Sequence, residues 1–246
     1  MAVWIIGDTH LSADGSKPMD VFGPGWADHQ ARLAAHWEKE VGAEDCVIIA
    51  GDISWAMHLE EALEDLRFLH GLPGRRKILL RGNHDYWWGT KTKVMRAFEE
   101  AGLDSLQLFQ NEAVLLPEAE RETLLLLGTR GWLLPSDEAF TTEDEKILRR
   151  ERIRLELSVK SADKIEARDK KSYARIAVMH YPPLGRDGRE TVFSSLLEDA
   201  AVRRCYYGHV HGAAGRLSFN GSRNGIEYRN IAADRLAFRP ERVDPA

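Results

Sequence analysis

Short runs of apolar residues alternate along this chain with longer segments whose apolar residues recur every three to four positions. The runs have the length of β-strands, and the periodic segments match one face of an α-helix. This alternation predicts an α/β fold built of layers. The expected strands lie within residues 3–10, 46–54, 77–85, 122–132, 174–183 and 203–212, and the expected helices lie within residues 27–41, 59–70 and 91–101.

Two further segments lie outside this alternation. Residues 215–220 and 226–240 predict a closing antiparallel hairpin set with Asn220-Gly221 as its turn. Residues 11–28 are rich in Gly, Pro, Ser and Asp and are too long for an ordinary connection between a strand and a helix. They fit a loop that faces a substrate and a solvated surface excursion equally well.

A helical insertion is predicted at residues 141–171. Thr142 and Glu145 have the spacing of a capping box. We expect one long or one broken amphipathic helix that covers the sheet or the mouth of a site. Since no repeat or linker interrupts the chain, residues 1–246 are predicted to form a single domain. The apolar face of the insertion contains Leu148, Leu155, Val159 and Ala162.

The composition is that of a globular protein, with 43% apolar and 30% charged residues in 246. A net charge of −5 argues against non-specific nucleic-acid binding, which needs a positive surface, but permits a small phosphorylated substrate. No apolar run approaches the ~18 residues of a membrane span, and the N-terminus lacks the basic region of a signal peptide. Cys46 and Cys205 lie in apolar runs and are expected to be reduced core thiols, which indicates a cytoplasmic protein.

Five polar clusters directly follow five of the expected strands. Because the carboxyl ends of neighbouring strands meet at one crevice, we expect these clusters to converge there. In an extended chain, residues two apart face the same side, which would pair Asp8 with His10 and His209 with His211. The clusters are Gly7-Asp8-Thr9-His10, Gly51-Asp52, Gly82-Asn83-His84-Asp85, Met179-His180 and Gly208-His209-Val210-His211.

Together the clusters supply three carboxylates, one amide and five imidazoles. Burying so many polar groups without a cation would cost many kcal/mol. Mixed oxygen and nitrogen ligands suit Mn, Fe, Co or Zn, whereas Mg and Ca prefer oxygen alone. The absence of cysteine ligands excludes a structural zinc finger. The clusters therefore predict a site for divalent transition metals.

The order Asp-x-His, Gly-Asp, Gly-Asn-His-Asp, His, Gly-His-x-His resembles the calcineurin-like metallophosphoesterase superfamily from Asp8 to His211. The segments GDISWA, RGNHDYWW and MHYPP are similar to those of its small bacterial predicted phosphohydrolases. The resemblance implies a four-layer α/β (α+β) fold, in which two mixed sheets pack as a sandwich flanked by helices. It also implies a dinuclear phosphohydrolase in which a metal-bridging hydroxide attacks a phosphomonoester or a phosphodiester in line.

The resemblance further implies a role for each polar residue. His84 would approach the phosphoryl group as a general acid or charge stabiliser without binding metal, and Asp85 would orient its ring. The cofactors would be two divalent ions, with Mn favoured over Fe, Zn, Co or Ni. One ion would be bound by Asp8, His10 and His211, the other by Asn83, His180 and His209, with Asp52 bridging both.

The alternative to an enzyme is an interaction scaffold that keeps the fold without catalysis. Such scaffolds typically lose the histidine at the position of His84 or several ligands, and this chain retains all of them. The pattern therefore favours the enzyme, and it leaves open the choice between monoester and diester, the substrate and the oligomeric state.

Several residues near the clusters have two open interpretations. The four aromatic residues that follow the second and third expected strands would pack in the core or form an apolar wall against a nucleoside or lipid group. Arg81, Arg130 and Tyr181 would contact phosphate or serve packing. Four histidines (His29, His36, His58 and His70) are assigned to helical segments, with His58 as a candidate rim residue. The aromatic residues are Trp55, Tyr86, Trp87 and Trp88.

Overall fold

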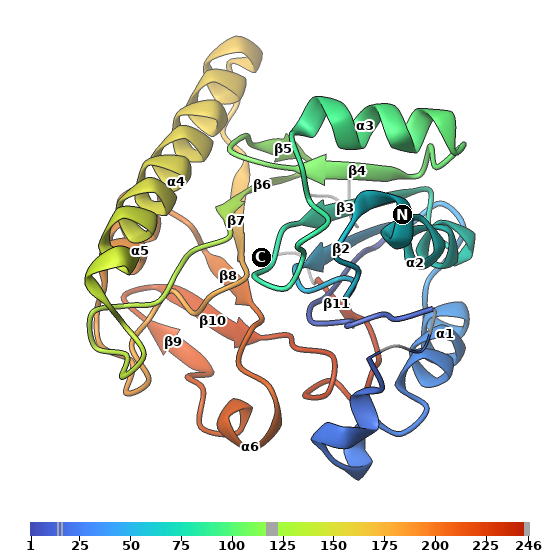
Figure 1. Ribbon diagram of the computed structural model, residues 1–246. Coiled ribbons are helices and arrows are strands. Elements are labelled where there is room, and N and C mark those ends of the chain that lie inside the picture. The colour runs from blue at the N-terminus through green and yellow to red at the C-terminus, as the bar shows by residue number, and fades with distance from the viewer. Residues whose placement is uncertain (14, 16, 117–122, 244–246) are drawn as a thin grey trace.

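Two β-sheets lie in the middle of the molecule, with helices on their outer faces (Figure 1). The computed structural model describes residues 1–13, 15, 17–116 and 123–243. In the first sheet four strands are parallel, and the edge strand β11 is antiparallel to β1. The order across this sheet is β11 (Glu241–Arg242), β1 (Val3–Ile6), β2 (Cys46–Ala50), β3 (Arg76–Leu80) and β4 (Leu106–Phe109).

The second sheet also has a parallel centre and antiparallel edges. Its strands β6, β7, β8 and β10 are parallel, while β5 and β9 pair antiparallel with their neighbours. Both sheets are therefore mixed, as expected. The order is β5 (Val114–Leu115), β6 (Leu124–Thr129), β7 (Ala174–Met179), β8 (Arg204–Tyr207), β10 (Ile226–Asn230) and β9 (Gly221–Arg223).

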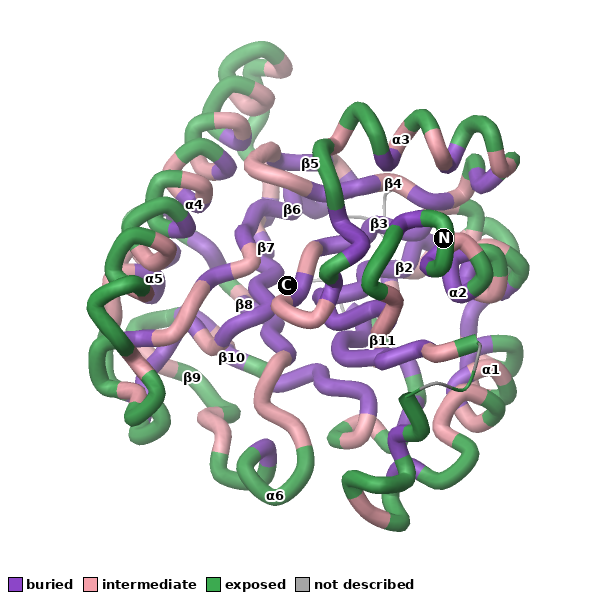
Figure 2. Tube along the Cα trace, in the orientation of Figure 1, coloured by how far each residue is buried: buried purple, intermediate pink, exposed green. Residues whose placement is uncertain are grey.

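The central strands are apolar on both faces, which is why they are continuous apolar runs in the sequence. In β2, Cys46, Ile48 and Ala50 face the other sheet, while Val47 and Ile49 face the helices. The second sheet repeats this alternation, since Ile176 and Val178 of β7 join the core between the sheets. Figure 2 shows these strands as the most buried part of the chain.

Helices complete the four layers, so the expected fold is confirmed. Three helices cover the first sheet: α1 (His29–Glu40), α2 (Leu59–Gly71) and α3 (Lys91–Glu100). The second sheet is covered by α4 (Thr142–Asp169) and α5 (Val192–Asp199). Three short elements remain: α6 (Gly212–Gly215) and the 3-10 helices η1 (Met19–Phe22) and η2 (Pro24–Trp26). Among the described residues, no helix is both long and apolar enough to cross a membrane.

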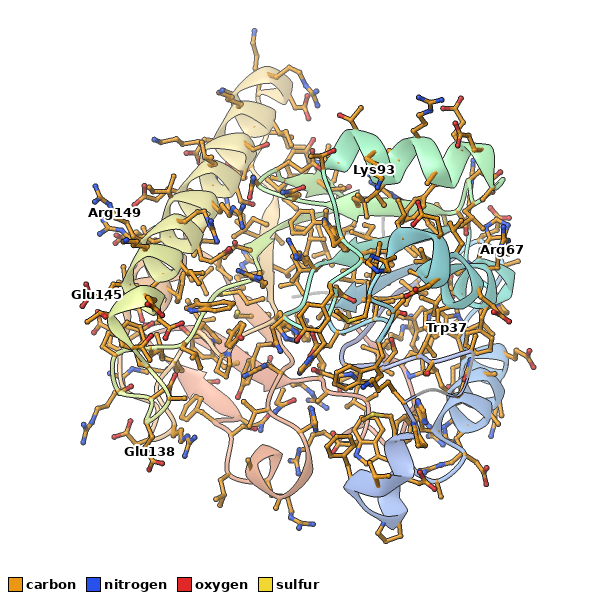
Figure 3. The ribbon with its side chains drawn as sticks, viewed as in Figure 1. Trp37, Arg67, Lys93, Glu138, Glu145 and Arg149 are labelled. Carbon is orange, nitrogen blue, oxygen red and sulfur yellow. The ribbon has the colours of Figure 1, made fainter. Side chains whose placement is uncertain are left out.

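The predicted insertion is one unbroken helix of 28 residues, α4. It packs on the outer face of the second sheet, and Glu145 and Arg149 point away from that sheet into solvent (Figure 3). The predicted cap was one residue late, because the extended Thr141 donates its backbone N–H to Asp144 at 2.8 Å. That α4 is an insertion within a single domain of residues 1–246 stays a prediction.

The C-terminal hairpin exists, but its turn is Asn224-Gly225 rather than Asn220-Gly221. Both turn residues have positive φ, 47° and 82°, which a two-residue hairpin connection requires. Residues 216–220 form no strand, and β10 pairs in parallel with β8. The hydrophobic pattern also missed several short elements, among them β4, β5 and α5. The first residue of the expected strand 122–132 lies outside the described residues.

Candidate metal centre

The five polar clusters meet where the carboxyl ends of the two sheets adjoin. The segments after β1 and β2 are joined by a hydrogen bond from the Asp8 N–H to the Gly51 carbonyl, 2.9 Å. Across the sheets, the His209 N–H donates to both carboxylate oxygens of Asp8 at 3.0 Å. The expected convergence of the clusters is therefore present.

The backbone at the centre is not extended, so one step of the sequence argument is wrong. Asp8, His10, Asp52 and His209 all have positive φ, between 45° and 68°. Such left-handed backbone costs about 1–3 kcal/mol per non-glycine residue and persists where surrounding contacts hold it. Asp8 and His10 still come together, whereas His209 and His211 point into different groups.

The polar side chains form two groups of potential metal ligands. One group is Asp8, His10 and His211, and the other is Asp52, His180 and His209. Within each group the donor atoms lie within 4.8 Å of one another. Asn83 belongs with the second group, because its Oδ1 lies 2.8 Å from His180 Nε2 and 2.8 Å from His209 Nδ1. This arrangement matches the ligand sets implied by the resemblance, and ligation by each residue stays a prediction.

Asp52 faces both groups. Its Oδ1 lies 3.4 Å from His180 Nε2 in one group, and its Oδ2 lies 3.8 Å from His10 Nε2 in the other. The side chain is 1% exposed. A carboxylate with one oxygen toward each group has the geometry of a bridging ligand.

His10 provides the test of whether a metal fits here. Both of its ring nitrogens are buried and have no hydrogen-bond partner among the described residues. Leaving a buried polar atom unpaired costs about 1–3 kcal/mol, which a bound cation would remove. His180 is also arranged as a ligand, because its Nδ1 lies 3.0 Å from the Ala50 carbonyl and its Nε2 is directed at the second group. The donor set therefore fits divalent transition metals.

Burial and mutual charge set the protonation of these groups. Burial lowers the pKa of His10 and of His209 to about 3, so both are in the neutral form that binds metals. Burial alone would favour a neutral Asp52, but His180 and His10 outweigh it and hold the pKa of Asp52 well below its usual range. Likewise, Asp52 and Asp8 overcome burial and raise the pKa of His180 to about 9. Burial raises the pKa of Asp8 well above its usual value.

At Gly82 and Gly208 the centre has no room for a side chain. A Cβ at Gly82 would overlap the backbone nitrogen and the carboxylate of Asp52. A Cβ at Gly208 would overlap Oδ2 of Asp8. Because they have no side chain, Gly82 and Gly208 leave room for the carboxylates of Asp52 and Asp8.

His84 lies at the open side of the centre, with its side chain 31% exposed and its Nε2 4.0 Å from Asp52 Oδ2. The sequence predicted that Asp85 orients the His84 ring, but among the described residues no hydrogen bond joins the two side chains. The Asp85 carboxylate instead accepts hydrogen bonds from the N–H groups of Gly82, Ile53 and Ser54 and from the Trp87 indole, at 2.7 to 3.3 Å. Since Asp85 is fully buried, its role in the structure is to hold the loop after β2 against the loop after β3.

Comparison with known proteins identifies the family. The model of calcineurin-like phosphoesterases matches residues 1–213. The chain belongs to the calcineurin-like phosphoesterase family. It is similar over the whole fold to two bacterial proteins of known structure. The protein of unknown function AQ665 from Aquifex aeolicus has a TM-score of 0.51 at 17% identity and covers 98% of this chain and 95% of its own. TT1561 of Thermus thermophilus has a TM-score of 0.53 at 12% identity, and the match covers 98% of this chain and 97% of TT1561.

Curated relatives are similar over a shorter stretch. The gene 66 protein of Mycobacterium phage D29 is 40% identical over 84 residues, which is 34% of this chain and 40% of the phage protein. The gene 66 protein of Mycobacterium phage L5 is 32% identical over 82 residues, which is 33% of this chain and 39% of the phage protein. The matched stretch thus spans about 40% of the length of either phage protein.

The aromatic residues that follow β2 and β3 divide between the candidate metal centre and the core. Trp55 stacks on the His10 ring with centroids 4.9 Å apart and lies 4.3 Å from the His84 ring. Tyr86 is half-exposed and meets the edge of the His84 ring at 6.0 Å. Trp87 and Trp88 are buried in the core beneath the helices. Trp55 and Tyr86 therefore lie beside His84, as the interpretation as an apolar wall expects, and Trp87 and Trp88 belong to the core.

Three residues near the candidate metal centre were missed or set aside by the sequence argument. Trp26, from the loop of residues 11–28, lies 5.5 Å from the His211 ring and 5.8 Å from the His10 ring. His29 has its Nε2 3.2 Å from the His10 carbonyl. Asp234 accepts a 2.6 Å hydrogen bond from the N–H of Gly212, directly after His211. The one signal of this kind in the sequence was a tryptophan, Trp26, in a loop rich in Gly, Pro, Ser and Asp.

Two other candidates, Arg130 and His58, have structural partners. Arg130 forms an ion pair with Glu151 at 3.2 Å and lies over the Trp132 ring at 4.4 Å, which favours packing over phosphate binding. Arg81 lines a small cavity with Arg130 and Glu151. His58 is exposed at the N-cap of α2, where Glu61 accepts its backbone N–H at 3.2 Å.

Proposed function

We propose that this chain is a dinuclear phosphohydrolase that cleaves phosphoester bonds, with Mn as the preferred metal. One observation carries the proposal: Asp52 faces both groups of donors, beside a fully buried His10 whose ring nitrogens have no protein partner among the described residues. Family membership over residues 1–213 supports it.

Each group would hold one ion. His211, with Asp8 and His10, would bind the first, and Asn83, with His180 and His209, would bind the second. When bound, the ions would supply the hydroxide nucleophile and neutralise charge on the phosphoryl oxygens. Asp52 would hold the two groups at a constant separation, and the Ala50 carbonyl keeps the His180 ring turned toward its ion.

His84 would act on the leaving group. Its ring lies against Trp55, reaches toward Asp52 and remains partly open to solvent, where a substrate would enter. In the reaction a hydroxide oxygen, left when a water releases one proton to solvent, would form a new bond to phosphorus. The bond from phosphorus to the leaving oxygen would break, and that oxygen would take a proton from protonated His84, which would regain one from solvent. Such proton transfer typically contributes 10²–10⁴-fold to the rate.

The experiment is turnover of bis-p-nitrophenyl phosphate and p-nitrophenyl phosphate by the purified chain with its metal content measured. We expect about two Mn ions per chain and release of p-nitrophenol that is lost on chelation and restored by Mn. The faster substrate decides between a diesterase and a monoesterase. A chain that binds two ions and turns over neither compound would contradict the proposal and favour a non-catalytic scaffold. Binding of one ion or none would contradict the dinuclear centre.

A further inference from the structure

A cavity of about 400 Å³ opens beside the candidate metal centre, and His209 and His211 lie at one end of it. Tyr181 is at the same end, with its ring centre 4.0 Å from that of His209. The remainder of the wall is largely apolar, with Leu134, Leu184, Leu217 and Phe219 among its residues. The size is that of pockets that enclose the organic part of a small ligand.

Four of the polar side chains in this wall, those of Trp132, Asp137, Tyr207 and Ser218, are already hydrogen-bonded within the protein. The Trp132 indole donates to Asp144 at 2.7 Å, and the Tyr207 hydroxyl donates to the Phe219 carbonyl. The Ser218 hydroxyl donates to the Gly215 carbonyl at 2.6 Å, and Asp137 accepts the Leu134 N–H at 2.7 Å. A nucleobase needs partners for its polar edge. With these four groups engaged and Leu134, Leu184 and Leu217 in the same wall, the pocket favours an aliphatic occupant over a base.

Exposed apolar side chains occur on the same loops that carry the centre. Leu217 is 78% exposed and Val21 is 71% exposed, and Phe22, Met57 and Tyr86 are each more than half exposed. Val21 and Phe22 precede Trp26 in the loop of residues 11–28, and Tyr86 contacts the His84 ring. Of these five side chains Leu217 lines the pocket, and an exposed apolar side chain at a pocket typically marks a surface for an apolar ligand.

We propose that this pocket binds an alkyl or acyl chain of the substrate, so that the enzyme acts on a phosphoester of an aliphatic, lipid-like alcohol. The assignment rests on the proposed function for the phosphoryl group, which would lie at the histidine end. The chain would extend from there along Leu134, Leu184 and Leu217.

The test uses a series of alkyl p-nitrophenyl phosphate diesters, from methyl to octyl, below their micelle concentrations and with the Mn-loaded enzyme. We expect kcat/KM to rise by up to about fourfold for each methylene that becomes fully buried and to level off when the pocket is filled. A flat series would overturn the assignment. So would a thymidine 5′-p-nitrophenyl ester that is preferred to the octyl ester.

Two exposed pairs of residues supply variants that lie outside the core. Ala214→Asp with Leu217→Asp places charge in the pocket wall, and Ile153→Asp with Leu157→Asp places the same charge on the outer face of α4. The pocket pair is expected to reduce the preference for octyl over methyl by about tenfold or more. The α4 pair is expected to retain it. A pocket pair that keeps the full preference would overturn the assignment.

Binding without turnover separates this inference from the proposed function. By calorimetry, octylphosphonate is expected to bind at least about tenfold more tightly than methylphosphonate, and the pocket pair is expected to lose this difference. If no ester is hydrolysed but the difference is found, the proposed hydrolysis fails and the pocket assignment holds. If the methyl ester is hydrolysed and octyl groups give no advantage in either assay, the pocket assignment fails and the hydrolase holds.

Discussion

The backbone N–H of His84 donates a 2.8 Å hydrogen bond to Oδ1 of Asp52. This bond ties the loop after β3 to the carboxylate that faces both groups of donors. Because it comes from the backbone, it is kept when the His84 side chain is removed. The structure therefore separates what the His84 ring does from what its peptide group supports.

His84→Ala is expected to keep about two metals and to lose roughly 10²-fold or more in kcat. The loss should be larger for an alkyl leaving group than for p-nitrophenolate, which departs with little help from a proton. Metal analysis and steady-state kinetics on both kinds of ester measure this. Equal losses on both esters together with loss of metal would instead assign a structural role to the ring.

Asp52→Asn is expected to lower metal content and rate more than a change at a ligand of one group alone. The reason is geometric, since the two Asp52 oxygens face His180 and His10 in different groups. Asp8→Asn is the matched control, because Asp8 belongs to one group only. The bridging role would belong elsewhere if Asp52→Asn stayed near normal in metal content and rate while Asp8→Asn lost both.

Gly82→Ala is expected to destabilise the protein by about 1–3 kcal/mol and to reduce metal binding, because the added methyl group overlaps Asp52. Gly71→Ala is the control, since a Cβ there meets no atom within 4 Å. Denaturant unfolding and metal titration of both variants check this. A Gly82→Ala protein as stable and as metal-rich as the control would disprove the tight fit.

The two cysteines are expected to be unreactive in the folded protein. Both side chains are fully buried. Burial raises the pKa of Cys46 to about 12 and raises the pKa of Cys205 further, so almost no thiolate is present at pH 8. Ellman's reagent should label neither thiol in the native state and both in guanidinium. Rapid labelling of one thiol in the native protein would refute this.

The central strands and the polar clusters could be predicted because each leaves a local mark in the sequence. A strand buried on both faces is a continuous apolar run, and a glycine with polar residues directly after it marks the end that carries the site. The turn of the hairpin could not be predicted in this way. The chain offers Asn220-Gly221 and Asn224-Gly225, and the choice depends on the pairing of Ile226–Asn230 with β8.

Contacts between distant segments could not be predicted from the sequence either. The positive φ at Asp8 and His10 depends on hydrogen bonds to the segment after β2, which no local pattern displays. Asp85 is adjacent to His84 in sequence, yet its partners are Gly82, Trp87 and two N–H groups of another loop. Trp26 and Asp234 reach the centre only through the tertiary fold.

Each group of donors takes members from both sheets, and Asp8 and His209, which contact one another, are 201 positions apart in the chain. During synthesis the segments after β1, β2 and β3 leave the ribosome long before those after β7 and β8. The early ligands therefore have no complete partner set until nearly the whole chain has emerged. On the proposed function, metal capture would be a late event in maturation, and the metal content of a preparation would measure the fraction of molecules whose two halves have joined.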